Sequence, residues 1–280
     1  MVEGIHQKEK DKMSKDSLGD RMKDYERRED RRFMNFAPVI ARMDGRGFSK
    51  WTQGLERPYD EQLSQAMVSV TRRLVEETGA RIGYTQSDEI TLVFLVEDIK
   101  QSMMFDGKLQ KLCSVLAGMT SSMFVTECLS RVDTEISRRA LQAPHFDARV
   151  FQVPTKTEAA NAVLWREKDA CKNAVSMAAR SFYSHSELQG RSAAQMQEMI
   201  FARGMNFNDY PAFFKRGTFL QMRSSESPLP EKAVAYLPEG ASTTVIRRSI
   251  EAIDMPIFSK VTNREAVIFD AAEPCVESED

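Results

Sequence analysis

Hydrophobic residues along the chain recur with two different spacings, and each spacing predicts one type of element. The run APVIARM at residues 37–43 is almost continuously apolar, which is typical of a buried strand. Further on, Asp60 can cap a helix that ends before Gly79, because a carboxylate accepts free amides at a helix start and glycine favours the left-handed turn after its end. The apolar positions of this expected helix share one face: Leu63, Met67, Val70 and Leu74.

Residues 80–154 predict a hairpin, a second helix and another strand. Two β-rich runs, 80–85 and 89–96, flank the polar segment 86–88, which is typical of a hairpin. Apolar residues then follow at helical spacing over 107–132, and HFDARVFQVP at 145–154 indicates a strand. The resulting order, β-α-β-β-α-β, is that of ferredoxin-type folds, so we expect an α+β core.

Beyond this core the pattern becomes mainly helical. Thr155 and Ser192 each start a capping-box pattern; the first opens a long amphipathic helix to about Phe182 and the second opens a shorter helix. A loop containing Pro211 then leads into a returning strand. Residues 224–245 show no regular period, and we expect them to be irregular.

These patterns divide the chain into three parts. Residues 1–20 are polar and lack apolar periodicity, so they predict a flexible arm. Residues 21–154 form the expected core, and 155–280 form a helical C-terminal extension with the returning strand. A chain of 280 residues is long enough to bury a substantial core of this kind.

Charge and cysteine content narrow the function only slightly. The formal net charge of -2 gives no overall attraction to nucleic acid, so a polyanion would have to meet a local basic surface. The four cysteines have neither C-x-x-C spacing nor companion histidines, which argues against a zinc site or a disulfide framework. We find no run of about 18 apolar residues, and the N-terminus is charged. A cytoplasmic protein with no membrane association is therefore expected.

Two carboxylates carry the candidate chemistry. Asp44 follows the first expected strand and Asp88 lies at the tip of the expected hairpin, so neighbouring strands would bring them together. Close carboxylates repel one another unless one is protonated or a cation lies between them. Mg²⁺ suits such a pair, because it binds one or two carboxylates together with phosphate oxygens, and Gly45 could add its carbonyl. The alternative is that D-G and S-D-E are ordinary turn sequences.

A resemblance to a known family adds to this interpretation. The chain resembles the tRNA-His guanylyltransferase family and its Thg1-like relatives over roughly residues 20–223, in six stretches that occur in the same order: ARMDGRGFSKW, ERPYD, GYTQSDEITLVF, HFDARVFQVP, LWREKDACKN and FNDYPAFFKRGTFL. The resemblance implies that 21–154 is a palm-like catalytic core that works in the direction opposite to ordinary polymerases. ATP would activate a 5′-monophosphate on tRNA, and the 3′-hydroxyl of GTP or another nucleoside triphosphate would then attack that phosphate. Two Mg²⁺ ions would assist.

The family's functional residues map onto two groups of positions in this sequence. The resemblance places metal ligands at Asp44, the Gly45 carbonyl and Asp88. It implies that Arg57 replaces a lysine involved in activation, so that with Asp44, Ser87 and Asp88 it completes the catalytic set. Its nucleotide-binding residues map to the following positions: Asp44, Gly45, Arg46, Gly47, Phe48, Ser49, Ser87, Asp88, Lys215 and Arg216. For Lys215 and Arg216, the alternative remains open that they are simply solvent-exposed basic residues at the start of a strand.

One departure from the family bears on the RNA substrate. Eukaryotic members carry HINNLYN, which the resemblance associates with reading the tRNA-His anticodon, whereas this chain has CKNAVSM at 171–177. This favours the bacterial and archaeal Thg1-like proteins, which add templated nucleotides to repair shortened tRNA 5′ ends. Candidate RNA contacts are Arg166, Lys168 and Lys172, with a solvated helix face as the alternative. Family members are typically homotetramers.

Three alternatives to templated repair remain from the sequence. The first is addition of a single guanylate to tRNA-His, and the second is a palm-type nucleotide cyclase with paired aspartates. The third is an RNA-binding protein without catalysis, which would have no need of Asp44, Ser87 and Asp88.

Overall fold

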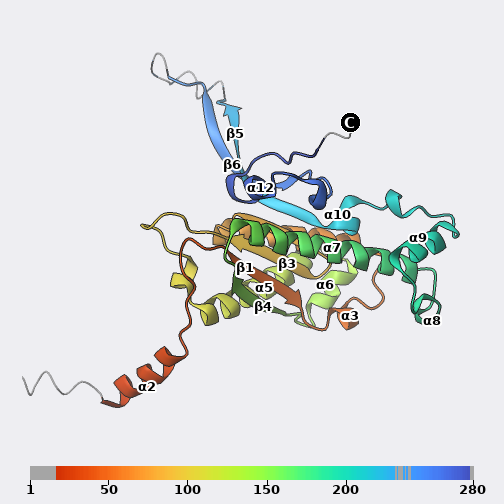
Figure 1. Cartoon of the computed structure of the whole chain (residues 1–280), viewed down its shortest axis with the longest axis horizontal. Helices are drawn as coiled ribbons and strands as arrows, with labels where there is room; N and C mark the ends of the chain where they lie inside the picture. Colours follow the sequence, from red (N-terminus) through yellow and green to blue (C-terminus); the bar gives the residue numbers. More distant parts are fainter. Residues whose placement is uncertain (1–16, 231, 233–235, 237, 239–240, 278–280) are drawn as a thin grey trace, which may run out of the picture.

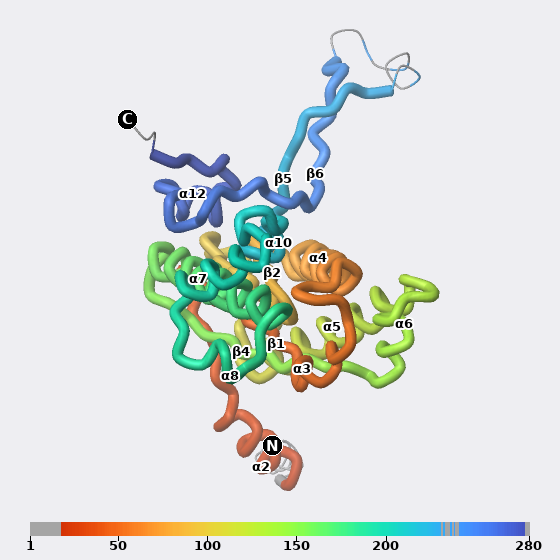
Figure 2. The backbone as a smooth tube through the Cα atoms, turned by 90° about the vertical axis from the view of Figure 1, so that its right-hand side faces the viewer, coloured from red at the N-terminus to blue at the C-terminus, as the bar shows by residue number. Residues whose placement is uncertain are grey.

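The structure is a computed structural model that describes residues 17–230, 232, 236, 238 and 241–277. Most of the predicted N-terminal arm, residues 1–16, lies outside the described residues. Helix α2 (Ser17–Arg28) follows and extends away from the body of the protein in both views (Figures 1 and 2).

A six-stranded antiparallel sheet organises the molecule. Its strand order is β4-β1-β3-β2-β5-β6. The strands are β1 (Val39–Gly45), β2 (Ile82–Gln86), β3 (Glu89–Phe94), β4 (Phe146–Gln152), β5 (Thr218–Pro228) and β6 (Thr244–Ile253). The first four strands and the two long helices between them follow the predicted β-α-β-β-α-β order, so the mixed α and β fold is confirmed.

Helices α4 (Glu61–Thr78) and α5 (Leu109–Ser130) cover one face of the sheet and share a core with it. The predicted cap of α4 is present, because the Asp60 carboxylate accepts the amide of Leu63 at 2.9 Å. Gly79 ends the helix with φ 68°, as expected. Three short elements complete this side: α3 (Phe48–Trp51), η1 (Met104–Gly107) and α6 (Glu135–Ala140).

Helix α7 (Lys156–Arg180) covers the opposite face together with α12 (Arg264–Asp270). Strand residues alternate between the two faces, so Ile40 packs toward α7 while its neighbour Ala41 packs toward α4 and α5. Figure 1 shows α7 lying along the sheet. The elements beyond it are α8 (His185–Leu188), α9 (Ala193–Phe201), η2 (Phe207–Asp209), α10 (Ala212–Arg216) and η3 (Phe258–Lys260).

The C-terminal part corrects one prediction. Residues 224–228 and 244–245 were expected to be irregular, with a single returning strand, but they belong to a β5–β6 hairpin that projects from the body (Figures 1 and 2). Its distal backbone pairs continue to Pro228 and Thr244. Most side chains there are exposed on both faces, so the segment has no apolar alternation from which a strand could be predicted.

Helix α5 bears on the expectation that no segment is apolar enough to span a membrane. It has a mean hydropathy of 1.4 and is long and apolar enough to cross a membrane by length and composition, the one such helix in the described part of the chain. In the structure it packs against β4 and α4, with Leu112, Leu116 and Phe124 buried in the core. A core helix with this composition passes the same test.

Candidate active site

The predicted carboxylates lie at one end of the sheet. Asp44 pairs in register with Glu89, the first residue of β3. Asp88 lies in the turn between β2 and β3, and its carbonyl oxygen accepts a hydrogen bond from the Gly45 amide at 3.1 Å. The structure thus brings Asp44, Gly45 and Asp88 together, while their roles as metal ligands remain a prediction.

Ser87 shapes the turn that holds Asp88. Its φ of 54° lies in the left-handed region that a tight hairpin turn requires. Its hydroxyl donates to Asp88 Oδ1 at 3.1 Å, so the serine orients the neighbouring carboxylate. The sequence predicted both residues at the hairpin tip, which is where they lie.

Burial and charge make Asp88 unusually easy to protonate. Burial, assisted by the negative charge of Asp44, raises the pKa of its carboxyl from 3.8 to about 6, and the Ser87 hydrogen bond partly opposes this rise. Burial also raises the pKa of Glu89, although its hydrogen bond with Arg166 lowers it. A site that destabilises negative charge in this way is one where a bound cation would be favourable.

The loop after Asp44 is anchored by an aromatic cluster. Phe48 begins α3 and packs its ring 5.1 to 5.4 Å from the rings of Trp51, Phe124 and Phe146. A Cβ on Gly45 would lie 2.3 Å from this phenylalanine ring, so the ring occupies space that only glycine leaves free. Gly47 adopts φ 70° at the start of the helix. Arg46 and Ser49, two further predicted nucleotide-binding residues of this loop, are exposed.

The donor set fits a hard divalent cation. No group of three or more histidine, cysteine, aspartate or glutamate side chains in the described residues could hold a metal ion by itself. The two carboxylates of Asp44 and Asp88, with the Gly45 carbonyl beside them, would therefore leave most coordination positions to water and phosphate oxygens. Mg²⁺ tolerates such a partial protein shell.

The carboxylates open into a cleft between the sheet, the loop at 55–60 and helix α7. Arg57 comes from that loop, and Arg166 and Arg180 come from the helix. The residues that line this cleft are Asp44, Phe48, Ser49, Thr52, Arg57, Gln86, Ser87, Asp88, Glu89, Arg166, Asn173, Ser176, Met177 and Arg180.

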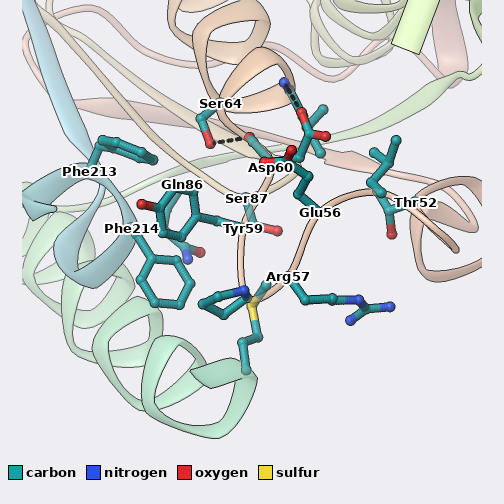
Figure 3. Close-up of a pocket in the computed structure, with 14 residues that line it drawn as sticks. Thr52, Glu56, Arg57, Tyr59, Asp60, Ser64, Gln86, Ser87, Phe213 and Phe214 are labelled. Atoms are coloured by element: carbon teal, nitrogen blue, oxygen red, sulfur yellow. Dashed lines mark hydrogen bonds between the residues drawn. The ribbon is translucent and has the colours of Figure 1, made fainter. Parts of the chain in front are cut away.

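A second, more apolar pocket adjoins the cleft and shares Arg57 and Ser87 with it. Figure 3 shows Tyr59, Phe213 and Phe214 grouped on one side of this pocket, while Arg57 extends in the other direction. The Tyr59 ring lies 5.2 Å from that of Phe213 and 5.0 Å from that of Phe214. Asp60 and Gln86 add polar groups to the lining, so the pocket offers aromatic surface with a few hydrogen-bonding atoms.

Comparison with known proteins places the chain in a family. A sequence profile of the family described as tRNA-His guanylyltransferase (Thg1) matches residues 19–154. An uncharacterized protein of Acanthamoeba polyphaga mimivirus is 33% identical over 65% of this chain and 69% of its own length. A solved bacterial Thg1-like protein in complex with ATP is 31% identical, with a TM-score of 0.72 over 90% of this chain and 97% of its own.

This chain belongs to the Thg1 family. It is therefore a nucleotidyltransferase of the tRNA-His guanylyltransferase type, as the order of its motifs predicted. A second solved bacterial Thg1-like protein, in complex with GTP, is 28% identical, with a TM-score of 0.69 over 88% of this chain and 95% of its own.

Five predicted nucleotide-binding residues of this Thg1-family chain are not among the residues that line the cleft: Gly45, Arg46 and Gly47 in the loop after Asp44, and Lys215 and Arg216 at the end of α10. The Lys215 ammonium donates to the carbonyl of Asn208 at 2.5 Å. The carbonyl of Arg216 accepts the Tyr84 hydroxyl at 2.9 Å. Burial raises the pKa of Glu167, and the Arg216 guanidinium partly opposes this rise. Neither Lys215 nor Arg216 is among the residues lining the cleft or the adjoining pocket, so a nucleotide contact by them stays a prediction.

Helix α7 corrects one prediction. Arg166 was expected on an exposed face, but its guanidinium is mostly buried and makes two hydrogen bonds of 2.6 Å to Glu89. The neighbouring Glu167 is also buried and accepts the Phe258 amide. Lys168 and Lys172 are exposed as predicted.

The same helix contributes cleft residues that sequence reasoning missed. Asn173, Ser176 and Arg180 line the cleft on the wall formed by α7. Their spacing of three and four residues puts them on one side of a helix, and this polar pattern was the available signal. It was hidden because the apolar stripe on the opposite side dominates the same segment.

Proposed function

We propose that this chain adds nucleotides to the 5′ end of tRNA in the 3′-to-5′ direction, with the incoming base chosen by a template strand. The observation that carries the proposal is the juxtaposition of Asp44 and Asp88 in the lining of a cleft that adjoins an aromatic pocket. In this view the β-α-β-β-α-β unit serves as a palm-like catalytic core.

The aromatic pocket is the proposed site of the nucleotide base. Base stacking needs a flat apolar surface, which Tyr59, Phe213 and Phe214 supply. A base seated there would direct its triphosphate past Arg57 toward Asp88, because both residues line the adjoining cleft. Solved relatives in complex with ATP and with GTP support these triphosphates as substrates.

The protein's own groups then divide the chemistry. When bound, two Mg²⁺ ions would align the attacking and leaving oxygens and offset their charge. Asp44, Asp88 and the Gly45 carbonyl would hold them. Arg57 would neutralise phosphate oxygens from the loop, and Ser87 keeps Asp88 oriented through its hydrogen bond. On RNA that begins with a monophosphate, ATP first adenylylates that phosphate and pyrophosphate is released. The 3′-hydroxyl of the incoming nucleoside triphosphate then attacks the same 5′ phosphorus, and AMP leaves; on RNA that begins with a triphosphate, pyrophosphate leaves in this step.

The altered motif at 171–177 supports the proposal that a template strand selects the incoming base. Its sequence CKNAVSM keeps only Asn173 of the eukaryotic HINNLYN pattern, and Asn173, Ser176 and Met177 line the cleft. With base pairing selecting the nucleotide, the protein needs to contact only RNA phosphates and 2′-hydroxyl groups. Single-guanylate addition to tRNA-His is the second candidate, supported by the family description. We further propose a cytoplasmic homotetramer.

Extension of a tRNA that lacks its first nucleotides tests the proposal. The purified protein, with Mg²⁺, ATP and all four nucleoside triphosphates, is expected to add nucleotides complementary to the opposite strand of the acceptor stem. Changing the anticodon should leave the rate unaltered. Addition of guanylate alone, only when the tRNA-His anticodon is present, would instead support the second candidate.

A further inference from the structure

The three arginines that line the cleft differ in what already neutralises them. Arg166 is engaged by Glu89 through two hydrogen bonds of 2.6 Å. The guanidinium groups of Arg57 and Arg180 make no hydrogen bond, ion pair or ring contact with any residue that the structure describes. Two positive charges therefore remain available to anions entering the cleft.

The two available arginines also differ in position. Arg57 lines both the aromatic pocket and the carboxylate cleft, so it lies where a nucleotide would pass from one to the other. Arg180 lines the cleft only, at the last residue of α7. The proposed reaction brings two phosphate-bearing molecules into this cleft, the nucleoside triphosphate and the RNA 5′ end. Arg180 lies outside the lining of the aromatic pocket proposed for the nucleotide base, so its position suits the RNA 5′ end.

The surface of α7 leads toward Arg180. Lys168, Lys172, Ser176 and Arg180 are spaced four residues apart, so they follow one slanted row on the helix. Both lysines and Arg180 are exposed, and Ser176 lines the cleft beside Arg180. An RNA backbone following this row would meet cations before its end reaches the carboxylates.

We propose that Arg180 binds the 5′-terminal phosphate of the RNA and so selects RNA with a phosphorylated 5′ end. This inference rests on the proposed function. A guanidinium can hold two phosphate oxygens at once, which suits a terminal phosphate better than a phosphodiester within the strand.

The test compares RNA binding by Arg180→Ala with binding by the unaltered protein. Fluorescence anisotropy would measure the Kd for an acceptor-stem hairpin carrying a 5′-monophosphate or a 5′-hydroxyl, without added nucleotide. We expect the unaltered protein to prefer the phosphorylated RNA. Arg180→Ala should lose about tenfold in affinity for phosphorylated RNA and nothing for hydroxyl RNA, because one charged hydrogen-bonding group is removed.

Two further variants separate this role from general charge. Arg180→Lys keeps the charge without the fork and should restore part of the preference. Arg191→Ala removes an exposed arginine from the segment between α8 and α9, outside the cleft lining, and should bind both RNAs like the unaltered protein. The KM for GTP in extension should be the same in Arg180→Ala as in the unaltered protein.

Several outcomes would overturn the inference. One is equal weakening of both RNAs in Arg180→Ala, and another is a raised KM for GTP with unchanged RNA binding. An unaltered protein that extends the phosphorylated RNA but binds the phosphorylated and hydroxyl RNAs equally well would refute the role of Arg180 while leaving the proposed function in place. Failure to bind or extend any RNA would refute both.

Discussion

Asp88 is a carboxyl group whose ionisation opposes folding. Its pKa in the folded protein is raised from 3.8 to about 6 by burial and by Asp44. The folded state therefore binds this proton more tightly than the unfolded chain does, so the carboxyl lowers stability progressively as pH rises from about 4 to about 6, and the loss stays constant above that.

Replacing this carboxyl group should stabilise the metal-free protein. In EDTA, Asp88→Asn is expected to raise the Tm, and the gap from the unaltered protein should widen between about pH 4 and pH 6 and then level off. Added Mg²⁺ at pH 8 should raise the Tm of the unaltered protein but not of the variant, because binding to the folded state stabilises it. A gap that is independent of pH would contradict the assigned burial.

Gly45 is the second residue-scale constraint. Gly45→Ala would place a methyl group 2.3 Å from the Phe48 ring, which cannot move without disturbing its aromatic neighbours. We expect a loss of about 1 to 3 kcal/mol in the free energy of unfolding, measured with urea. Gly118→Ala is the control, because no atom lies within 4 Å of its new methyl group, and there a gain of up to about 1 kcal/mol is expected. Equal effects at both sites would refute the packing argument.

At the scale of elements, the ion pair between α7 and β3 joins the helix to the sheet beside the site. The side chains of Arg166 and Glu89 are only 14% and 15% exposed. Arg166→Ala would leave the carboxylate buried without its partner, and we expect a loss of about 3 kcal/mol in the free energy of unfolding. Arg73→Ala breaks the exposed pair with Glu77 and should cost less than about 1 kcal/mol.

Chemical denaturation of both variants checks this comparison. Adding Glu89→Ala to Arg166→Ala should recover part of the loss, because the uncompensated charge is then removed. If Arg166→Ala unfolds at the same urea concentration as the unaltered protein, the Arg166–Glu89 ion pair does not stabilise the packing of α7 on the sheet.

Element prediction succeeded where local patterns agree with packing. Asp60 and Gly79 mark the two ends of α4, and both ends could be predicted because capping interactions act within a few residues. Strand β1 was recognisable because it is buried on both faces. The ion pair of Arg166 could not be predicted, since its partner Glu89 is 77 residues away. Arg180 was missed for a related reason: a cleft lining depends on how α7 lies over the sheet.

At the scale of the whole molecule, the order of the core elements could be predicted from the sequence, but the β5–β6 hairpin of the C-terminal extension could not. Apolar and β-rich runs identified β1 to β4, whereas the distal β5–β6 hairpin is exposed and has no such signal. Helix α7, assigned from sequence to the C-terminal extension, packs with Ile40 and Val93 of the sheet. Both faces of the sheet are therefore covered, and the cleft lies where α7 and the loop at 55–60 meet its end.

The central claim is that Asp44 and Asp88 act together in nucleotide transfer. Single-turnover extension of a 5′-shortened tRNA by Asp44→Asn and Asp88→Asn tests it most directly, with Asp147→Asn as the control. Asp147 lies on β4 and pairs in register with Asp44 on β1, but it is exposed and outside the cleft lining. We predict that either cleft variant slows extension by about a thousandfold or more while remaining folded, and that the control keeps its rate. Extension at the unaltered rate by either cleft variant would contradict the account.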